Sequence, residues 1–399
     1  MKKILICSHA MDIGGAERAL LNLLYSFDYK KYQVDLFLMR HQGELMKYIP
    51  KEVCLLPEIK EYTCLAVPIL DVLNKKKLRI LYGRIKGKIK AAFYVKRKKL
   101  NQDNGVGLEY SHKYTCKYMP VISNDEYDLA ISFLTPHYFV RDKVIAKKKI
   151  AWIHTDYSYV ETDVQSEYKM WNAYDYVASI SDTCTEGFCN KFPELRNKII
   201  RIDNILSTES IKIQADEFVP TTEMPADEFI KLLSVGRFCH QKNFDNVPDI
   251  CKRIHNEDLK VKWYLIGFGP GDELIRKKIK ESGIEEFVVI LGKKENPYPY
   301  MKMCDLYIQP SRYEGNCVSV HEAQALAKPV VITNYSTATS QLTNGVDGVI
   351  VPMDNKGCAD EICKLLKDMK RMRQLQENCA KFDYSNAIEV EKIYRLMED

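Results

Sequence analysis

The sequence predicts an α/β protein made of two Rossmann-like, doubly wound domains. Short apolar runs alternate with longer segments of helical periodicity, which is the order that βαβ units produce. Several runs are apolar throughout, as in parallel strands whose two faces are both covered by helices. Twelve or more such runs exceed one comfortable open sheet, and 399 residues are too many for one small domain.

The first domain is predicted over residues 1–206. Its expected strands are 3–7, 33–38, 53–56, 128–133, 149–154, 175–179 and 198–202. Helical patterns fall between these strands, for example over 16–25 and 183–191. The segment 75–99 interrupts this alternation, because twelve of its 25 residues are Lys or Arg and none is acidic.

The alternation restarts in a second domain, predicted over 229–382. Its expected strands are 230–235, 261–266, 288–291, 306–309, 330–333 and 349–351. A polar linker containing Pro220 and Pro225 is predicted over 207–228. A long helix near 356–381 precedes a final helix over 385–397, and the segment 383–399 is expected to return to the first domain.

The cysteine content and the distribution of apolar residues indicate the cellular compartment. The thirteen cysteines form no CxxC pair and no metal-like spacing, which favours buried thiols in a reducing cytosol and predicts no metal site. Only four apolar residues follow Lys2 and Lys3, too few for a secretory signal, and no segment has the length and apolarity of a membrane span. We therefore expect a cytoplasmic protein.

The loop after the first strand contains Gly14 and Gly15. Paired glycines allow the backbone to approach a ligand closely, and the helix that begins near Ala16 offers unpaired N–H groups. A plain tight turn is the alternative interpretation. The loop is not GxGxxG, so nicotinamide binding is not favoured. In the other domain, the glycines of 267–271 are expected to serve close packing of a loop rather than a dinucleotide.

Two loops of the second domain carry charged residues. Arg237 and Lys242 lie between a strand and a helix, placed to face a diphosphate, although two solvated surface cations are the alternative. After the strand 306–309, Glu314 lies in the loop and Glu322 lies early in the next helix. A loop carboxylate can accept hydrogen bonds from sugar hydroxyls, and the helical one can reach a ribose diol. The intervening backbone of 315–317 can hold an anion at the helix N-terminus.

These motifs resemble the donor site of retaining glycosyltransferase family 4, particularly enzymes of bacterial capsule and exopolysaccharide synthesis. The resemblance runs from 296–298 through 310–315 to 328–330, and Glu314 and Glu322 match the family's E-x7-E motif. It implies a GT-B fold, with two domains facing across a cleft, the acceptor on the first and a nucleotide sugar on the second. A UDP-sugar is the expected donor, and no metal or other cofactor is expected.

The resemblance also implies roles for individual residues. Arg237 and Lys242 would neutralise the diphosphate, and Glu314 would hold the sugar hydroxyls. The implied donor-binding residues are Gly15, Gly315, Asn316, Cys317 and Glu322, of which Asn316 and Cys317 depart from the family's usual residues. His154 resembles the first-domain histidine that lies against the transferred sugar. A histidine at a strand end can instead satisfy a backbone carbonyl.

Within 75–99, apolar residues recur at spacings of three and four, which predicts an interfacial amphipathic helix weakened by Gly83 and Gly87. The cations expected to face an anionic membrane are Lys75, Lys76, Lys77, Arg84, Lys88, Lys96 and Arg97. A solvated charged helix is the alternative. Nucleic-acid binding is not favoured, because no recognised module is evident.

These observations predict a cytoplasmic retaining glycosyltransferase on the inner face of the cell membrane. It would move a hexose-type sugar from a nucleotide diphosphate to a lipid-linked or oligosaccharide acceptor in cell-surface polysaccharide synthesis. Two alternatives stay open: a non-catalytic partner subunit that keeps the fold, and a nucleotide-sugar epimerase of the same architecture.

Overall fold

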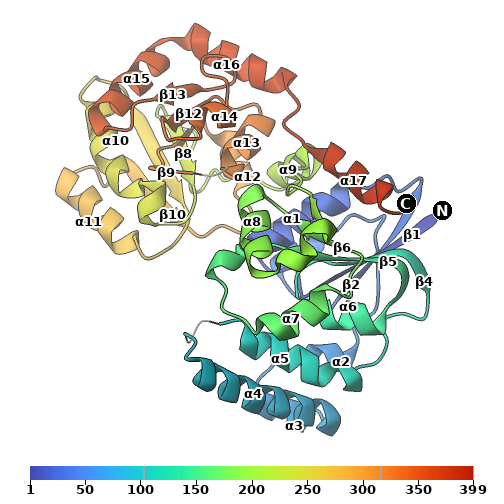
Figure 1. Ribbon diagram of the computed structural model, residues 1–399. Helices are drawn as coiled ribbons and strands as arrows, with labels where there is room; N and C mark the ends of the chain where they lie inside the picture. The colour runs from blue at the N-terminus through green and yellow to red at the C-terminus, as the bar shows by residue number, and fades with distance from the viewer. Residues whose placement is uncertain (102–103, 136, 315–316, 399) are drawn as a thin grey trace. The chain divides into compact units, whose positions relative to one another are not determined.

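The computed structural model describes residues 1–101, 104–135, 137–314 and 317–398 (Figure 1). The chain divides into two compact units: unit 1 comprises Met1–Ile205 and Asn386–Asp399, and unit 2 comprises Leu206–Ser385. Each unit contains one sheet in which all paired strands are parallel, with helices on both faces. The predicted α/β class with two Rossmann-like domains is confirmed.

The sheet of unit 1 has the order β3-β2-β1-β4-β5-β6-β7. Its strands are β1 (Lys2–Ser8), β2 (Tyr32–Leu38), β3 (Cys54–Leu55), β4 (Glu126–Ser132), β5 (Ile145–Ile153), β6 (Tyr176–Ser179) and β7 (Ile199–Arg201). Successive side chains of a strand point to opposite faces. Accordingly, β1 contributes Ile4 and Ile6 to one hydrophobic core and Leu5 and Cys7 to the core on the other face.

The α-helices of unit 1 are α1 (Gly15–Tyr25), α2 (Lys60–Thr63), α3 (Ile69–Asn74), α4 (Leu78–Lys98), α5 (Val106–Thr115), α6 (His137–Lys143), α7 (Val164–Trp171), α8 (Asp182–Lys191) and α17 (Val390–Arg395). Helices α1 and α17 share one core, while α6, α7 and α8 cover the opposite face.

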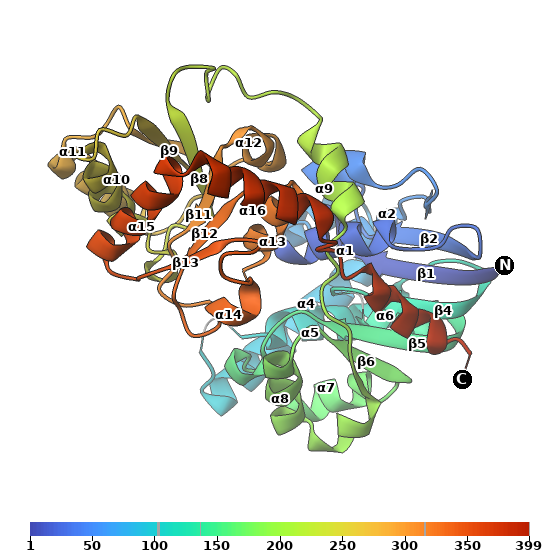
Figure 2. The ribbon, with the colours of Figure 1, turned by 90° about the horizontal axis from the view of Figure 1, so that it is seen from above.

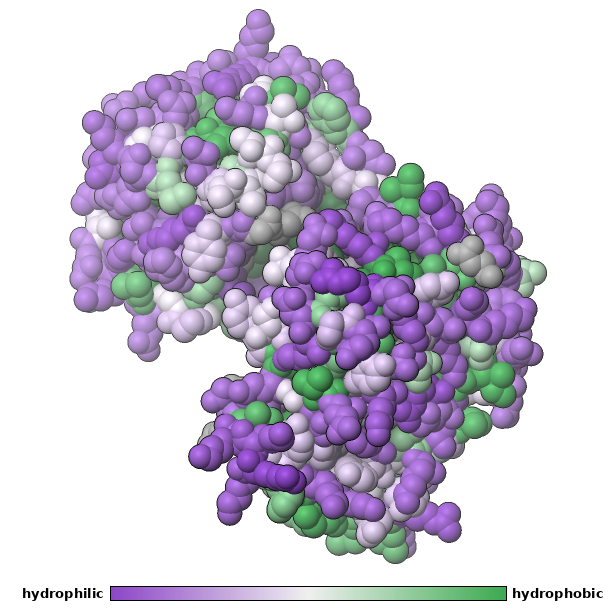
Figure 3. Space-filling model, viewed as in Figure 1, coloured by the Kyte–Doolittle hydropathy of each residue, from purple (hydrophilic) through white to green (hydrophobic). Residues whose placement is uncertain are grey.

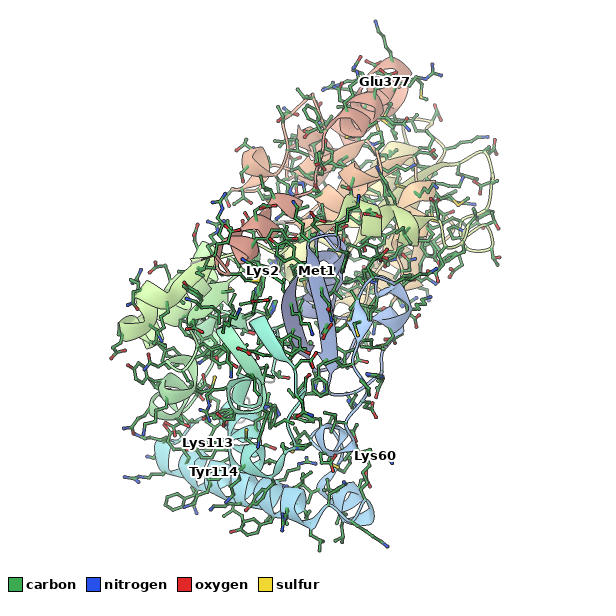
Figure 4. All side chains as sticks on the ribbon, turned by 90° about the vertical axis from the view of Figure 1, so that its right-hand side faces the viewer. Met1, Lys2, Lys60, Lys113, Tyr114 and Glu377 are labelled. Carbon is green, nitrogen blue, oxygen red and sulfur yellow. The ribbon has the colours of Figure 1, made fainter. Side chains whose placement is uncertain are left out.

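The C-terminal segment packs on unit 1, as Figure 2 shows for the red end of the chain. The ring of Tyr394 stacks on Tyr32 with centroids 4.0 Å apart, and the Asp28 N–H donates to the Tyr394 hydroxyl at 2.8 Å. Lys2 donates to the carbonyl of Met397 at 3.1 Å (Figure 4). The α-helical part is shorter than predicted, because a 3-10 turn at Ala387–Glu389 precedes α17.

The sheet of unit 2 has the order β10-β9-β8-β11-β12-β13. Its strands are β8 (Ile230–Val235), β9 (Val261–Ile266), β10 (Val288–Gly292), β11 (Leu306–Gln309), β12 (Val330–Thr333) and β13 (Val349–Val351). Its α-helices are α9 (Thr208–Ala215), α10 (Val247–His255), α11 (Asp272–Ser282), α12 (Tyr298–Met303), α13 (Val318–Ala325), α14 (Ala338–Gln341), α15 (Asn355–Lys367) and α16 (Met369–Lys381).

Two predicted elements of unit 2 were wrong. The linker predicted over 207–228 contains α9, whose N-terminus is capped by Ser207 and whose Ile211 and Ala215 are buried in a core of unit 2. The long helix predicted over 356–381 is two helices. It breaks at Asp368, whose carboxylate accepts from the Arg371 N–H at 2.9 Å and caps α16.

Each sheet reverses its strand order once, at β1/β4 in unit 1 and at β8/β11 in unit 2. Ligands of open α/β sheets bind outside the carboxyl ends of strands at such a switch point. The loops that follow these four strands are therefore the places to look for chemistry.

Candidate functional site

The loops that follow β8 and β11 are joined at the switch point of unit 2. The Arg312 N–H donates to the Gln241 carbonyl at 2.8 Å, and the Asn243 side chain donates to the Pro310 carbonyl at 2.8 Å. Asn243 has a left-handed backbone with φ of 61°, which asparagine tolerates better than most residues. These contacts hold the two charged loops in a fixed register.

The carboxylate of Glu314 is the centre of this site. Its Oε1 accepts from Lys242 Nζ at 2.7 Å and from Ser311 Oγ at 2.6 Å, and its Oε2 accepts from Gln241 Nε2 at 3.0 Å. The side chain of Glu314 is 5% exposed and that of Lys242 is 14% exposed. Lys242 and Glu314, predicted to share a site, therefore form a largely buried ion pair.

Lys242 stays cationic in this setting. Burial acts to lower the pKa of its ammonium, but the neighbouring Cys317 sulfur, 3.5 Å away, and the Glu314 carboxylate together raise the pKa above its usual value. A positive charge is thus held beside the loop that follows β11.

Arg237 differs from Lys242. It is exposed, and its guanidinium makes no hydrogen bond or ion pair with any other described residue. Its loop is supported by 267–271: a Cβ at Gly267 would lie 1.9 Å from the Gly236 carbonyl oxygen, and one at Gly269 would lie 2.6 Å from that of Phe238. The prediction that these glycines serve close loop packing is confirmed, and the head of Arg237 is available to a ligand.

The predicted anion cradle before α13 needs a correction. The Cys317 N–H, expected to be available to a diphosphate, donates to Gln341 Oε1 at 2.8 Å because this amide side chain lies against the start of the helix. Gly315 and Asn316, the other two members of the predicted cradle, lie outside the described residues. Glu322 is buried on α13 and accepts from the Tyr298 hydroxyl at 2.7 Å.

In unit 1, Gly15 is the exposed first residue of α1. A Cβ there would meet nothing within 4 Å, whereas one at Gly14 would lie 2.1 Å from a Glu17 carboxylate oxygen. The Glu17 side chain can move aside and the Gly14 backbone is extended with φ of −150°, so the turn does not require glycine at position 14. Gly15 leaves the helix N-terminus open, as a phosphate-binding backbone needs.

His154 follows β5 and lines a cavity of about 220 Å³ inside unit 1. Burial lowers the pKa of its imidazole to about 4, and a hydrogen bond with the Phe133 backbone only partly offsets this effect. Its Nε2 has no hydrogen-bond partner among the described residues. His154 is thus a neutral imidazole that satisfies a backbone group and keeps one nitrogen for another partner.

Sequence reasoning missed the residues that support these sites. Gln241 and Ser311 hold the Glu314 carboxylate, and both are immediate or near neighbours of predicted site residues. Their position beside charged motif residues was the available signal. Glu109, Thr135 and Trp152, which line the unit 1 cavity, carried no comparable signal, because they come from separate segments.

Most of the basic segment forms α4, which Lys75, Lys76 and Lys77 precede, and the cations of the segment have two roles. Arg84 Nη1 donates to the carbonyls of Cys64 at 2.7 Å and Val67 at 2.5 Å, and Lys77 pairs with Glu61. These two side chains anchor the preceding loop, so their predicted membrane-facing placement is corrected. Lys75 donates to Thr63 Oγ1 at 3.1 Å from an exposed position. The remaining predicted cations are exposed: Lys76, Lys88, Lys96 and Arg97.

The family match found by comparison with known proteins lies within unit 2. Residues 221–382 match the family described as glycosyl transferases group 1. Over 156 residues, 39% of this chain and 41% of the relative, the sequence is 30% identical to a Campylobacter jejuni N-acetylgalactosaminyltransferase whose name specifies a diphospho-undecaprenol substrate. Over 159 residues, which are 39% of this chain and 43% of the relative, the sequence is 27% identical to the amylovoran biosynthesis glycosyltransferase AmsD of Erwinia amylovora. The chain thus spans about two fifths of the length of these curated relatives.

Solved structures match the whole chain. Anabaena HepE in complex with UDP and glucose has a TM-score of 0.60 at 16% identity, with all of both chains covered. TarM of S. aureus, in a complex that includes UDP, has a TM-score of 0.62 at 14% identity, again with all of both chains covered. These likenesses show that the chain has the GT-B fold of such glycosyltransferases.

Proposed function

We propose that the chain is a retaining glycosyltransferase that transfers a hexose-type sugar from a UDP-sugar to a glycan acceptor. The observation that carries the proposal is the buried Lys242–Glu314 pair at the carboxyl ends of β8 and β11, with the exposed guanidinium of Arg237 on the same loop as Lys242. This cluster lies within the span that matches glycosyl transferases group 1. The UDP in the complexes of HepE and TarM supports a uridine nucleotide as the leaving group.

In the proposed reaction, the bond between the sugar and the diphosphate breaks on the face that the acceptor hydroxyl attacks. The departing phosphate oxygen takes the acceptor's proton, so no protein base is required. Arg237 would offer its planar fork to the diphosphate, and Lys242 would add a fixed charge. The remaining lone pair of Glu314 Oε2 would accept from a sugar hydroxyl, and Glu322 would bind the ribose. Preorganised charge of this kind lowers the barrier without reorganisation.

The test is calorimetric titration of the full chain with UDP and a panel of UDP-, GDP- and dTDP-sugars, followed by NMR of the product's anomeric centre. We expect a UDP-sugar to bind, and its anomeric configuration to be retained in the product. Arg237→Ala should weaken UDP binding about tenfold, whereas Arg373→Ala, an exposed arginine on α16, should not. Binding of no nucleotide sugar, an inverted product, or isomerised free donor without transfer would each contradict the proposal.

We further propose that α4 lies on the inner, anionic face of the cell membrane, where a lipid-linked acceptor would be met. Small residues of α4 pack on α5: a Cβ at Gly87 would lie 2.7 Å from the Tyr110 carbonyl oxygen, and one at Gly83 would lie 2.9 Å from that of Tyr114. Lys86 Nζ lies 5.5 Å from the Tyr114 ring centre. The glycines predicted to weaken this helix therefore seat it on α5.

That seating leaves the large apolar residues of α4 in solvent. They are between 40% and 67% exposed: Leu78, Tyr82, Ile85, Ile89 and Phe93. Figure 3 shows hydrophobic residues among hydrophilic ones along the lower edge, where Figure 1 draws α3 and α4. Apolar residues flanked by exposed lysines match an interfacial helix, and charge complementarity favours anionic lipid. Among the described residues, none of the helices is long and apolar enough to cross a bilayer.

Vesicle sedimentation tests this membrane surface. The chain should bind vesicles that contain anionic phosphatidylglycerol and bind neutral phosphatidylcholine vesicles much more weakly, with affinity falling as salt rises. Phe93→Ser combined with Ile89→Ser should abolish binding. Ile388→Ser, which removes an equally exposed apolar residue outside α4, should leave binding intact. Equal binding to both vesicle types, or to neither, would remove the membrane proposal and leave the enzyme proposal standing.

A further inference from the structure

The segment that follows β12 contacts the loop that follows β11 at residues 314 and 317, on either side of 315–316, which lie outside the described residues. The Thr337 hydroxyl donates to the Glu314 carbonyl at 2.8 Å. The Gln341 side chain makes two bonds with the backbone of Cys317: its Oε1 accepts from the N–H at 2.8 Å, and its Nε2 donates to the carbonyl at 3.3 Å. Helix α14 and the turn before it therefore support the loop that carries Glu314.

The two bonds to Cys317 set the orientation of the Gln341 amide. The N–H of Cys317 needs an acceptor, so the oxygen of the amide must face it and the NH2 group must point the other way. That NH2 group also lies against His321, with 2.8 Å between Gln341 Nε2 and His321 Nε2. Two N–H groups cannot donate to each other, so His321 Nε2 must be an acceptor that carries no proton.

A second glutamine gives the same answer at the other nitrogen of the imidazole. Gln324 Nε2 donates to the Asp347 carbonyl at 3.1 Å, so Gln324 Oε1 faces His321 Nδ1, 3.0 Å away. An amide oxygen can only accept, so Nδ1 must carry the proton. The two glutamines thus select one neutral tautomer of His321. Four hydrogen bonds then point in one direction, from the Cys317 N–H to the Asp347 carbonyl.

The surroundings of His321 favour its neutral state. Burial lowers the pKa of the imidazole, although the bond with Gln324 and the carboxylate of Asp347 oppose the shift. The ring of Tyr384 lies 6.3 Å from the imidazole, centre to centre, and its hydroxyl lies 3.4 Å from the Asp347 carboxylate. Glu322, the neighbouring carboxylate on α13, has its own hydrogen-bond donor. A second proton, on Nε2, would face an NH2 group and break the series of bonds.

We propose that Gln341 and His321 are positioning residues of the nucleotide-sugar site, and that His321 serves only in its neutral form. Protonation of Nε2 would force the Gln341 amide to turn over, and both of its bonds to Cys317 would be lost. The loop that carries Glu314 would then lose its support at residue 317, so a nucleotide sugar would bind more weakly in acid. That the loop receives a nucleotide sugar rests on the proposed function; the tautomer rests on the hydrogen bonds alone.

The first measurement identifies the tautomer of His321. In the full chain with isotope-labelled histidine, long-range proton–nitrogen NMR spectra separate a protonated from an unprotonated ring nitrogen, and His321→Gln assigns the signals. At about pH 8 the proton should be on Nδ1. Gln341→Glu, which places an oxygen against Nε2, should put a proton on Nε2. A wild-type chain with the proton on Nε2 at about pH 8 would overturn the proposal.

The second measurement is the affinity for UDP-glucose, UDP-galactose, UDP-N-acetylglucosamine and UDP-N-acetylgalactosamine, by calorimetry between about pH 8 and about pH 5. The wild type should bind its preferred UDP-sugar at least about threefold more weakly at the acid end. The loss should occur below the ordinary imidazole pKa of 6.5, because burial lowers the pKa of His321. His321→Gln has no ring to titrate and should lose this pH dependence. Gln341→Leu should bind about fivefold more weakly throughout.

His255→Gln is the matched control, because this histidine lies on α10 with its Nε2 2.9 Å from the Val261 carbonyl. It should keep the wild-type affinity and pH dependence. A wild-type affinity that does not change with pH, an unchanged pH dependence in His321→Gln, or wild-type affinity in Gln341→Leu would each overturn the proposal. If no UDP-sugar binds the wild type at any pH, the proposed function is refuted, and the tautomer still decides whether His321 and Gln341 are bonded as described.

Discussion

Each unit contains a buried carboxylate held by hydrogen bonds, Glu314 in unit 2 and Glu109 in unit 1, and the two differ in how fully they are paired. Glu314 in unit 2 accepts from Lys242, Ser311 and Gln241, so both of its oxygens have partners. Glu109 in unit 1 has a buried oxygen, Oε2, with no hydrogen-bond partner among the described residues. The first carboxylate is thus fully paired, and the second is only half paired.

The surroundings of the two carboxylates also differ in charge. Unit 2 places a buried ammonium and an exposed guanidinium at its site, while the unit 1 cavity is lined by neutral imidazoles and no cation. Preformed positive charge suits an anionic diphosphate, which agrees with the nucleotide site proposed in unit 2. Each prediction below tests one side of this difference between the units.

The largest expected effect comes from Lys242→Met. Removing one member of a buried ion pair leaves the other charge without compensation, and the free energy of unfolding should fall by about 3 kcal/mol or more. Urea unfolding measures this loss. Lys242→Met combined with Glu314→Gln removes both charges and should recover part of it. A Lys242→Met variant as stable as the wild type would show that the cluster is not preassembled.

Arg237→Ala should leave stability unchanged, because the guanidinium has no partner among the described residues. Transfer should nevertheless fall about 100-fold in kcat/KM, as when one preorganised donor to a developing charge is removed. Steady-state kinetics measures the loss of activity, and thermal unfolding of the same samples measures the stability. A loss of stability comparable to that of the lysine variant would erase the distinction between the two cations.

The buried carboxyl of Glu109 predicts that the free energy of unfolding depends on pH. Burial raises the pKa of its carboxyl from 4.5 to about 7. The negative charge of Glu167 also raises this pKa, whereas hydrogen bonds from Ser166 and Tyr138 and the positive charge of Lys113 lower it. Between pH 4.5 and 7 the folded chain holds a proton that the unfolded chain releases, so this carboxyl's contribution to stability is present below pH 4.5 and lost by pH 7. The shift corresponds to about 3 kcal/mol at most.

Comparing the wild type with Glu109→Gln separates the effect of this carboxyl from that of the buried histidines. The lowered pKa values of those histidines make stability rise with pH, which is the opposite direction. The glutamine variant should gain stability relative to the wild type as pH rises through the window, measured as the difference in unfolding free energy at each pH. A difference that stays constant from pH 4 to pH 8 would show that the carboxyl is not held in a desolvating cavity.

The smallest expected effect concerns the support of the cavity, since α5 carries Glu109 and α4 packs on it. A Cβ at Gly87 would lie 2.7 Å from the Tyr110 carbonyl oxygen, so Gly87→Ala should destabilise by about 1 kcal/mol despite its better helix propensity. Gly107→Ala on α5 meets nothing within 4 Å and should stabilise by a similar amount. Chemical unfolding of the two variants measures both changes in the free energy of unfolding. If both variants were stabilised, or both destabilised, the close contact at Gly87 would be refuted.

The sequence revealed much of the fold and part of the site. Every predicted strand corresponds to a strand of the structure, because continuous apolar runs mark parallel strands buried on both faces. That Lys242 and Glu314 share a site was predictable as well, since loops that follow neighbouring strands meet at a switch point, but their ion pair was not predicted. Helix breaks were less visible: Asp368 is acceptable within a helix as well as at its cap, and only the structure decides between them.

The unit 1 cavity could not be predicted, for a physical reason. Glu109 lies on α5, Thr135 follows β4 and Trp152 lies on β5, so tertiary packing alone brings them together. Nothing in the local sequence distinguishes the half-paired Glu109 from the fully paired Glu167. Likewise, the capture of the Cys317 N–H by Gln341 depends on where α14 packs.

The most direct measurement is a calorimetric titration of UDP into three proteins: wild type, Arg237→Ala and Glu109→Gln. The nucleotide site proposed in unit 2 predicts that UDP binds the wild type, binds Arg237→Ala about tenfold more weakly, and binds Glu109→Gln, a variant of unit 1, as well as it binds the wild type. UDP affinity that is indifferent to Arg237 and falls with Glu109→Gln would contradict the account.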